Sequence, residues 1–160
     1  MKKILILLIL VFTSFCFSQN QNTLIGTWQQ QTGNDIFRIE IEREIGQYED
    51  GTPKSVTLGH FQIIELDNNG NETIILNSDQ TINPNTPNSF QLPHAIRGGF
   101  YNYESSYYLF QFTDINGTTT DLHIEVLDNN SLLPNQIKWT LKGIIIGDLN
   151  VPKNATLTRQ

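Results

Sequence analysis

The chain has 160 residues, a formal net charge of −6 at pH 7 and a single cysteine. This length is enough for one domain with a sizeable core. The acidic balance argues against nucleic acid and anionic lipid surfaces as partners, because both repel a negatively charged protein. A single cysteine excludes the small disulfide-stapled scaffolds, which need several pairs.

The first 18 residues have the three parts of a secretory signal peptide. Lys2 and Lys3 give a charged start, residues 4–12 form a short apolar core, and small residues follow. The apolar run is shorter than the about 20 residues that a membrane-spanning helix needs. We therefore expect a secreted or periplasmic protein, with residues 1–18 as signal peptide, residues 19–160 as a single domain and no transmembrane segment in the mature chain.

Cleavage is expected between Ser18 and Gln19, because Cys16 and Ser18 occupy the two small-residue positions before the cut. Cleavage removes 18 of the 160 residues, two lysines among them, so 142 residues remain and the net charge changes from −6 to −8. The alternative is a lipoprotein acylated at Cys16. Phe15 stands where lipid attachment needs a small residue, so the sequence favours cleavage without an anchor.

The rest of the chain predicts β-strands. Phe37, Ile39 and Ile41 alternate with charged residues, and the same period of two recurs over residues 120–127 and 137–143. No segment has a convincing helical period, and Asn-Gly and Asp-Gly turn signals separate the alternating segments. The strands expected in chain order are 24–30, 35–44, 55–66, 72–78, 96–104, 107–113, 120–127, 137–143 and 154–159.

Eight or nine short strands in a continuous meander predict an all-β antiparallel up-and-down barrel, with a β-sandwich as the alternative. Closure of a barrel removes the exposed edges of a sheet. One long connection, residues 79–95, interrupts the meander with Pro84, Pro87 and Pro93. A connection of this length is either a functional loop, such as a lid, or a solvated crossover, and the sequence leaves both open.

Gly26, Thr27 and Trp28 open the first strand after the signal peptide. This Gly-x-Trp motif resembles the first strand of lipocalin-like barrels, which include the fatty-acid-binding proteins. The resemblance implies that Trp28 plugs one end of the barrel and that Arg159, on the last strand, packs across it. Neither the C-terminal helix nor the helical pair of those families has a counterpart here, which leaves open whether the barrel holds a ligand cavity.

The whole chain also resembles a family of small secreted bacterial proteins of unknown function. These proteins share a signal that ends in Ser-Gln, a Gly-Thr-Trp start and a Pro-x-x-x-Thr-Leu-Thr close, which here spans Pro152 to Thr158. The resemblance covers most of the chain and implies no activity.

The aromatic stretch of residues 100–112 is the first candidate binding site. We expect a hairpin that turns at residues 105–106 and sets Tyr101 opposite Phe110. Alternation then gives one face to Gly99, Tyr101, Tyr103, Tyr108, Phe110 and Phe112. Such a face suits an apolar or sugar ligand, and it equally suits the thick part of a core. Just before the stretch, Gly98 and Gly99 indicate a β-bulge or a close approach of two backbones.

Two other groups of residues contain side chains that can bind metal ions. The histidines, His60, His94 and His123, are far apart and lack the spacing of zinc ligands. Residues 67–71 begin like a calcium loop, with side-chain oxygens at alternate positions. The glycine and the closing glutamate of that loop are missing, so a hairpin turn explains the segment better. We expect no metal and no cofactor.

No pattern points to catalysis. Glu40, Glu42 and Glu44 lie on one strand face, whereas a glycosidase needs two carboxylates across a cleft. The first function that we expect is non-enzymatic binding of a small apolar molecule or an envelope component outside the cytoplasm. The alternative is a secreted interaction or inhibitor protein without a ligand cavity. The volume of the barrel interior distinguishes these two functions, since a ligand-binding protein needs a cavity of about 300 Å³ or more.

Overall fold

The computed structural model describes residues 23–160 except 48–49, 80–94, 103–106, 128–133 and 144–148. The expected signal peptide, its cleavage site and most of the long connection therefore lie outside the described residues. Nine strands are present: β1 (Gly26–Thr32), β2 (Asp35–Gln47), β3 (Pro53–Leu66), β4 (Glu72–Asn77), β5 (Ile96–Asn102), β6 (Tyr107–Thr113), β7 (Thr119–Val126), β8 (Gln136–Lys142) and β9 (Asn154–Arg159). No helix that could cross a membrane occurs among these residues.

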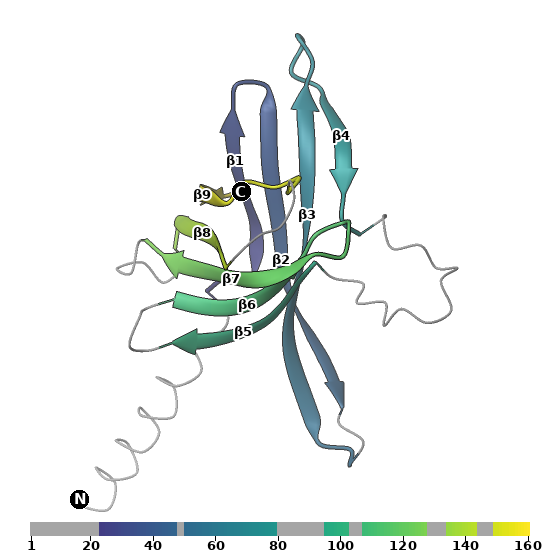
Figure 1. Ribbon diagram of the computed structural model, residues 1–160, viewed down its shortest axis with the longest axis vertical. Coiled ribbons are helices and arrows are strands. Elements are labelled where there is room, and N and C mark those ends of the chain that lie inside the picture. The colour runs from purple at the N-terminus through teal and green to yellow at the C-terminus, as the bar shows by residue number, and fades with distance from the viewer. Residues whose placement is uncertain (1–22, 48–49, 80–94, 103–106, 128–133, 144–148) are drawn as a thin grey trace, which may run out of the picture.

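Eight of the strands close into an antiparallel barrel, and β4 lies outside it (Figure 1). The sheet runs in the order β2-β1-β9-β8-β7-β6-β5-β3-β4, and a further pairing of β2 with β3 closes the ring. Apart from β4, neighbours in the barrel are neighbours in sequence, so the predicted up-and-down barrel is confirmed. All nine expected strands are present, and their ends differ from the prediction by three residues at most.

The alternation of side chains sets which face of each strand forms the core. In β2, Phe37, Ile39 and Ile41 are buried, while the intervening Glu40 and Glu42 are exposed. The same alternation appears in β8, where every second residue is buried. Burial of apolar side chains is the main favourable term in folding, so this pattern is what selects the strand register.

A hydrogen-bonded ion pair ties β4 to the barrel. Arg38, on β2, donates from Nη2 and Nη1 to the two carboxylate oxygens of Glu72, on β4, at 2.7 and 3.0 Å. Because β3 lies between β2 and β4, the two side chains cross over β3. Ile64 of β3 is fully buried, although its neighbours in sequence place it on the outer face of the barrel. The pair therefore adds a side-chain contact between β2 and β4 to the backbone pairing of β4 with β3.

Asp67 and Asp114 organise two hairpin loops in the same way. The Oδ1 atom of Asp67 accepts the N–H groups of Asn69 and Asn71 at 2.7 and 2.8 Å. The Oδ1 atom of Asp114 accepts two N–H groups at the same offsets, at 2.9 and 2.7 Å. These bonds explain the alternating side-chain oxygens of residues 67–71 as a turn.

Replacing Asp114 with alanine should lower the free energy of unfolding by about 1–3 kcal/mol, because two backbone N–H groups lose their acceptor. Asp114 is buried, whereas Asp67 is exposed, so water replaces the carboxylate more readily in the Asp67→Ala variant. Denaturant unfolding of both variants checks the prediction. An equal loss in the two would show that burial is not what makes the Asp114 loop matter.

Candidate functional site

Trp28 and Arg159 meet at one end of the barrel. They lie opposite each other on β1 and β9, and the guanidinium carbon of Arg159 lies 4.2 Å from the centre of the indole ring. This is the geometry of a cation–π contact. Trp28 is fully buried and donates its indole N–H to the carbonyl oxygen of Leu24 at 2.8 Å. The structure thus brings together the two residues expected at the barrel plug.

Arg159 also binds the segment that leads into β1. Its Nη1 and Nη2 groups donate to the carbonyl oxygens of Ile25 and Thr23 at 2.8 and 2.6 Å, and Nε donates to that of Pro134 at 3.0 Å. Burial lowers the pKa of Arg159, yet a guanidinium stays protonated in proteins. One charged side chain therefore joins the entrance of β1, the entrance of β8 and the end of β9.

Gly26 makes room for this arginine. A Cβ atom at position 26 would lie 2.8 Å from Nη1 of Arg159, and the backbone has a φ of +132°, which side chains disfavour. The positive φ favours glycine at position 26, and the absence of a Cβ atom leaves room for the guanidinium group of Arg159. The contact of Arg159 with Trp28 thus explains why glycine lies two residues before the tryptophan.

A second tryptophan is held in a similar way elsewhere in the barrel. Trp139, on β8, is fully buried and donates its indole N–H to the carbonyl oxygen of Pro152 at 2.9 Å. Val151, in the same connection before β9, is buried against the core. Val151 and Pro152, just before β9, therefore lie against the core beside Trp139.

The residues of the candidate aromatic face that the structure describes with their side chains belong to the core. Tyr108, Phe110 and Phe112 of β6 are 5%, 2% and 0% exposed and pack in the main hydrophobic cluster. Tyr103 lies outside the described residues. The expected pairing of Tyr101 with Phe110 is wrong, because Tyr101 lies opposite Tyr108.

A β-bulge at Gly98 and Gly99 adds a second shift on the other side of Tyr101 from the turn. The register shifts between Gly98, which lies opposite Phe110, and Phe100, which lies opposite Leu109. Gly99 has a φ of +105°, and a Cβ there would lie 3.1 Å from the Phe110 ring. The bulge predicted from the two glycines is confirmed, and it places Ile96 instead of Gly99 opposite Phe112.

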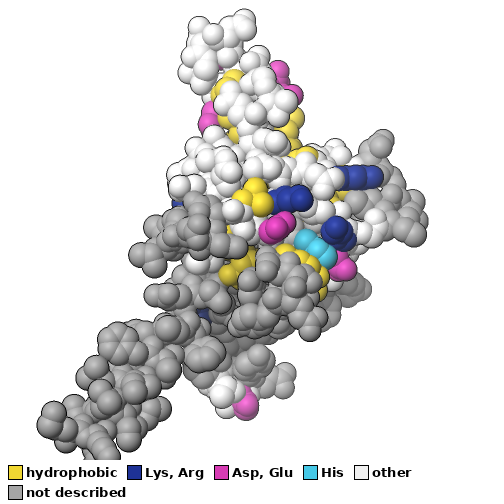
Figure 2. Space-filling view, turned by 90° about the vertical axis from the view of Figure 1, so that its left-hand side faces the viewer, with side chains coloured by type: hydrophobic (Ala, Val, Ile, Leu, Met, Phe, Trp, Pro, Cys, Tyr) yellow, Lys and Arg dark blue, Asp and Glu magenta, His cyan; other side chains and the backbone are white. Residues whose placement is uncertain are grey.

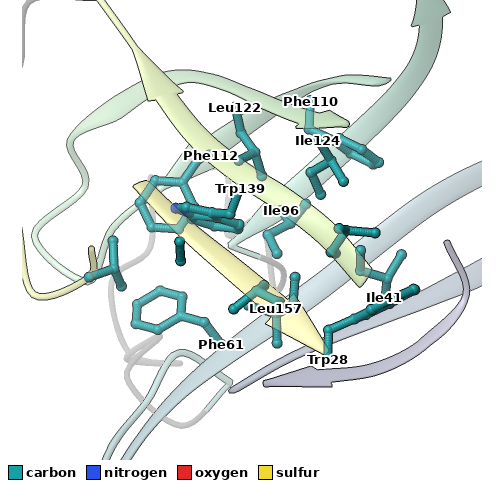
Figure 3. Close-up of a cluster of buried hydrophobic side chains, with 14 of the residues drawn as sticks. Trp28, Ile41, Phe61, Ile96, Phe110, Phe112, Leu122, Ile124, Trp139 and Leu157 are labelled. Carbon is teal, nitrogen blue, oxygen red and sulfur yellow. The ribbon is translucent and has the colours of Figure 1, made fainter. Parts of the chain in front are cut away.

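Four aromatic rings meet across the inside of the barrel. The ring of Phe37 on β2 lies 5.2 Å from Trp139 on β8 and 6.5 Å from Phe61 on β3, centre to centre. The ring centre of Phe112, on β6, lies 5.4 Å from that of Trp139 and 5.5 Å from that of Phe61. These are ordinary distances for packed aromatic pairs. Figure 3 shows Phe61, Phe112 and Trp139 pointing toward one another from their separate strands.

Each of the eight barrel strands contributes at least one side chain with no exposed surface. These residues are Trp28, Ile39, Phe61, Ile96, Phe112, Leu122, Ile124, Ile137, Trp139 and Leu157. A ligand cavity would leave accessible surface on the side chains that line it, and these have none. In the described part of the chain, the interior at these positions is filled by the protein itself.

His60 lies on the outer face of β3 between two carboxylates. Its Nε2 is 3.4 Å from Glu42 and its Nδ1 is 3.8 Å from Asp79. The two carboxylates thus face different ring nitrogens, whereas metal ligands converge on one point. His94 lies outside the described residues. Among those that are described, no three His, Cys, Asp or Glu side chains gather closely enough to hold a metal ion.

The surface beside His60 has a small polar hollow. Arg38, Glu40, His60 and Gln62 line it, and its volume is about 20 Å³. This is room for about one water molecule and too little for an organic ligand.

His123, on the outer face of β7, stacks on Tyr107. The ring centres are 4.1 Å apart and the planes are 11° apart. Burial lowers the pKa of His123 below its ordinary value, the charge of Lys142 adds to this, and Asp121 acts in the opposite direction. The folded state therefore binds a proton at His123 less readily than the unfolded chain does.

Acid should consequently weaken the fold through His123. Below the ordinary histidine pKa of about 6.5 the unfolded chain takes up the proton first, so stability falls as the pH drops. The His123→Gln variant should lose less stability than the wild type between about pH 7.5 and pH 5. Denaturant unfolding at both pH values measures this difference, and equal losses would assign the acid sensitivity to other groups.

The model of a family of unknown function, DUF6705, matches residues 1–160. The chain belongs to this family. No curated protein and no solved structure matches the chain. Membership agrees with the expected family of unknown function and implies no activity. The resemblance to lipocalin-like barrels rests on the Gly-x-Trp motif alone. For this member of DUF6705, function has to be inferred from the filled barrel and its outer surface.

Proposed function

We propose that the protein acts outside the cytoplasm as a non-enzymatic interaction protein that binds a partner through its outer surface. The contact of four aromatic rings across the barrel carries this proposal, because rings from β2, β3, β6 and β8 occupy the space where a barrel would hold a small molecule. Of the two functions expected from the sequence, the filled interior supports the one without a ligand cavity.

The location rests on the N-terminal pattern. A charged start, a short apolar core and small residues before Gln19 are what export and cleavage require. The described domain is compatible with an oxidising space, since its stability comes from a packed core and no cysteine lies beyond Cys16.

The absence of catalysis is part of the proposal. The structure describes two of the three histidines. His60 faces two carboxylates and His123 stacks on a tyrosine ring, and both arrangements support a structural role. The glutamates of β2 are exposed on one strand face, whereas a glycosidase needs two carboxylates facing each other across a cleft.

Native mass spectrometry of the protein exported by its own host tests the proposal. We expect a chain of 142 residues that begins at Gln19 and carries no small-molecule adduct, together with a complex that contains another protein. A stoichiometric apolar adduct would contradict the interaction role. A chain that retains residues 1–18, or carries acyl groups on Cys16, would contradict the expected processing.

A further inference from the structure

β4 gives the sheet an open edge. It is the end strand of the nine-stranded sheet, and in the described part of the chain it pairs with β3 alone. In an antiparallel pair every second residue directs its N–H and C=O groups away from the partner strand. An extended segment of another protein can bind to such an edge as an added strand.

The side chains of β4 include neither of two residue types that commonly prevent another strand from pairing with an edge. Ile74 and Ile75 are 53% and 57% exposed, and no lysine or proline occurs in Glu72–Asn77. These two residue types are common means of protecting an edge strand. Ile75 has no residue opposite it on β3, because the register shifts there. Such a bulge increases the local twist, so the edge suits a short added strand better than a long flat one.

The surroundings of β4 are acidic. Glu65 lies opposite Asp35 on β2 and opposite Thr73 on β4, and both acids are exposed, as is Asp67 in the adjoining loop. The nearby cation, Arg38, already holds Glu72. Figure 2, which views the molecule from the side opposite β4, shows acidic and hydrophobic side chains on the hairpins that project above the barrel. The acids on the barrel side of β4, together with the net charge of −6, therefore favour a basic partner.

We propose that the open edge of β4 binds an extended, positively charged segment of a partner protein as an added strand. Backbone hydrogen bonds to β4 provide affinity, apolar side chains of the segment pack on Ile74 and Ile75, and basic ones face the surrounding acids. A second copy of the chain is a poorer occupant, because each copy carries a net charge of −6. The inference rests on the proposed interaction role and names the surface and the partner chemistry.

A labelled octapeptide of alternating lysine and valine is the probe, and fluorescence anisotropy with the purified full-length protein is the measurement. Two control peptides have the same length. One replaces each lysine with glutamate, and the other has proline at its two central positions and cannot form a continuous strand. We expect the lysine–valine peptide to bind at least about tenfold more tightly than either control. Equal binding of the glutamate or the proline peptide would overturn the proposal, as would the absence of binding.

Two lysine substitutions locate the peptide. Ile74→Lys places a charge on the edge and should weaken binding of the lysine–valine peptide at least about tenfold. Ile45→Lys, at the 77% exposed isoleucine on β2, adds the same charge elsewhere and should change binding by less than about twofold. Circular dichroism checks that both variants fold. Equal loss in the two variants, or a dimer of the wild type that Ile74→Lys dissolves, would overturn the proposed occupant.

A competition experiment separates this inference from the proposed function. The peptide is added to the complex that the exported protein forms with its partner. Displacement of the partner supports the open edge as its binding site. A partner protein that stays bound would overturn the inference and leave the interaction role standing, whereas a small molecule in place of a partner would overturn the interaction role itself.

Discussion

Replacing Phe112 with alanine should lower the free energy of unfolding by about 3–5 kcal/mol. Phe112 has no exposed surface, and its ring packs against Phe61 and Trp139 on two other strands. Removing it loses the transfer free energy of the ring and leaves a void that the neighbouring rings fill only in part. Denaturant unfolding followed by tryptophan fluorescence gives the difference.

The same variant also tests whether the barrel is filled. Benzene should not bind inside the wild type, and it should bind in the void of Phe112→Ala, since apolar cavities left by one large side chain accept guests of this size. Phe112→Leu keeps most of the volume and should lose less stability and bind less benzene. Benzene binding inside the wild type would show that an apolar cavity exists without any substitution.

Replacing Arg159 with methionine should lower the free energy of unfolding by about 2–4 kcal/mol, because three backbone carbonyl groups lose a charged donor. The side chain is partly exposed, so water limits the loss. The contact with the Trp28 ring is lost as well, which should change the tryptophan fluorescence of the folded state.

Two control substitutions show whether the loss belongs to the guanidinium group. Arg159→Lys keeps the charge but replaces the planar set of donors by a single ammonium group, so it should fall between the wild type and Arg159→Met. Lys153→Met removes an exposed cation and should change stability by less than about 0.5 kcal/mol. Equal effects of Arg159→Met and Lys153→Met would mean that only net charge matters.

The strands and their inward faces could be predicted because both follow from local patterns. Ile39 and Ile41 alternate with glutamates, and burial of one face is the only arrangement that keeps the charges in water. Loops such as residues 67–71 carry their own turn residues, which fixed the ends of β3 and β4. Closure into a barrel followed from the short connections between successive strands.

The position of β4 could not be predicted, because it depends on pairing between distant strands. The sequence of β4 has the composition of any other strand. What places it outside the barrel is that Thr57–Gly59 of β3 pairs with β5, while a later part of the same strand pairs with β4. The contact between Arg38 and Glu72 likewise joins residues that are 34 positions apart.

The register of β5 against β6 shows a different limit. The two glycines predict the bulge, but the pairing of Tyr101 depends on where the hairpin turns. The partner of Tyr101 differs from the expected one by two residues, and because the side-chain period is two, Tyr101 still shares a face with Tyr108. The part of this face on β6, Tyr108 to Phe112, is core.

The seam between β1 and β9 determines how the protein folds. Arg159 reaches Ile25 and Thr23 across 134 and 136 positions of chain, while the hairpins join strands separated by short loops. The entropy cost of closing a loop rises with its length, and such long-range contacts slow folding. We therefore expect the hairpins to form early and the seam to close last. Until it closes, β1 and β9 expose two further strand edges, so the last step of folding is also the step that protects the chain from aggregation.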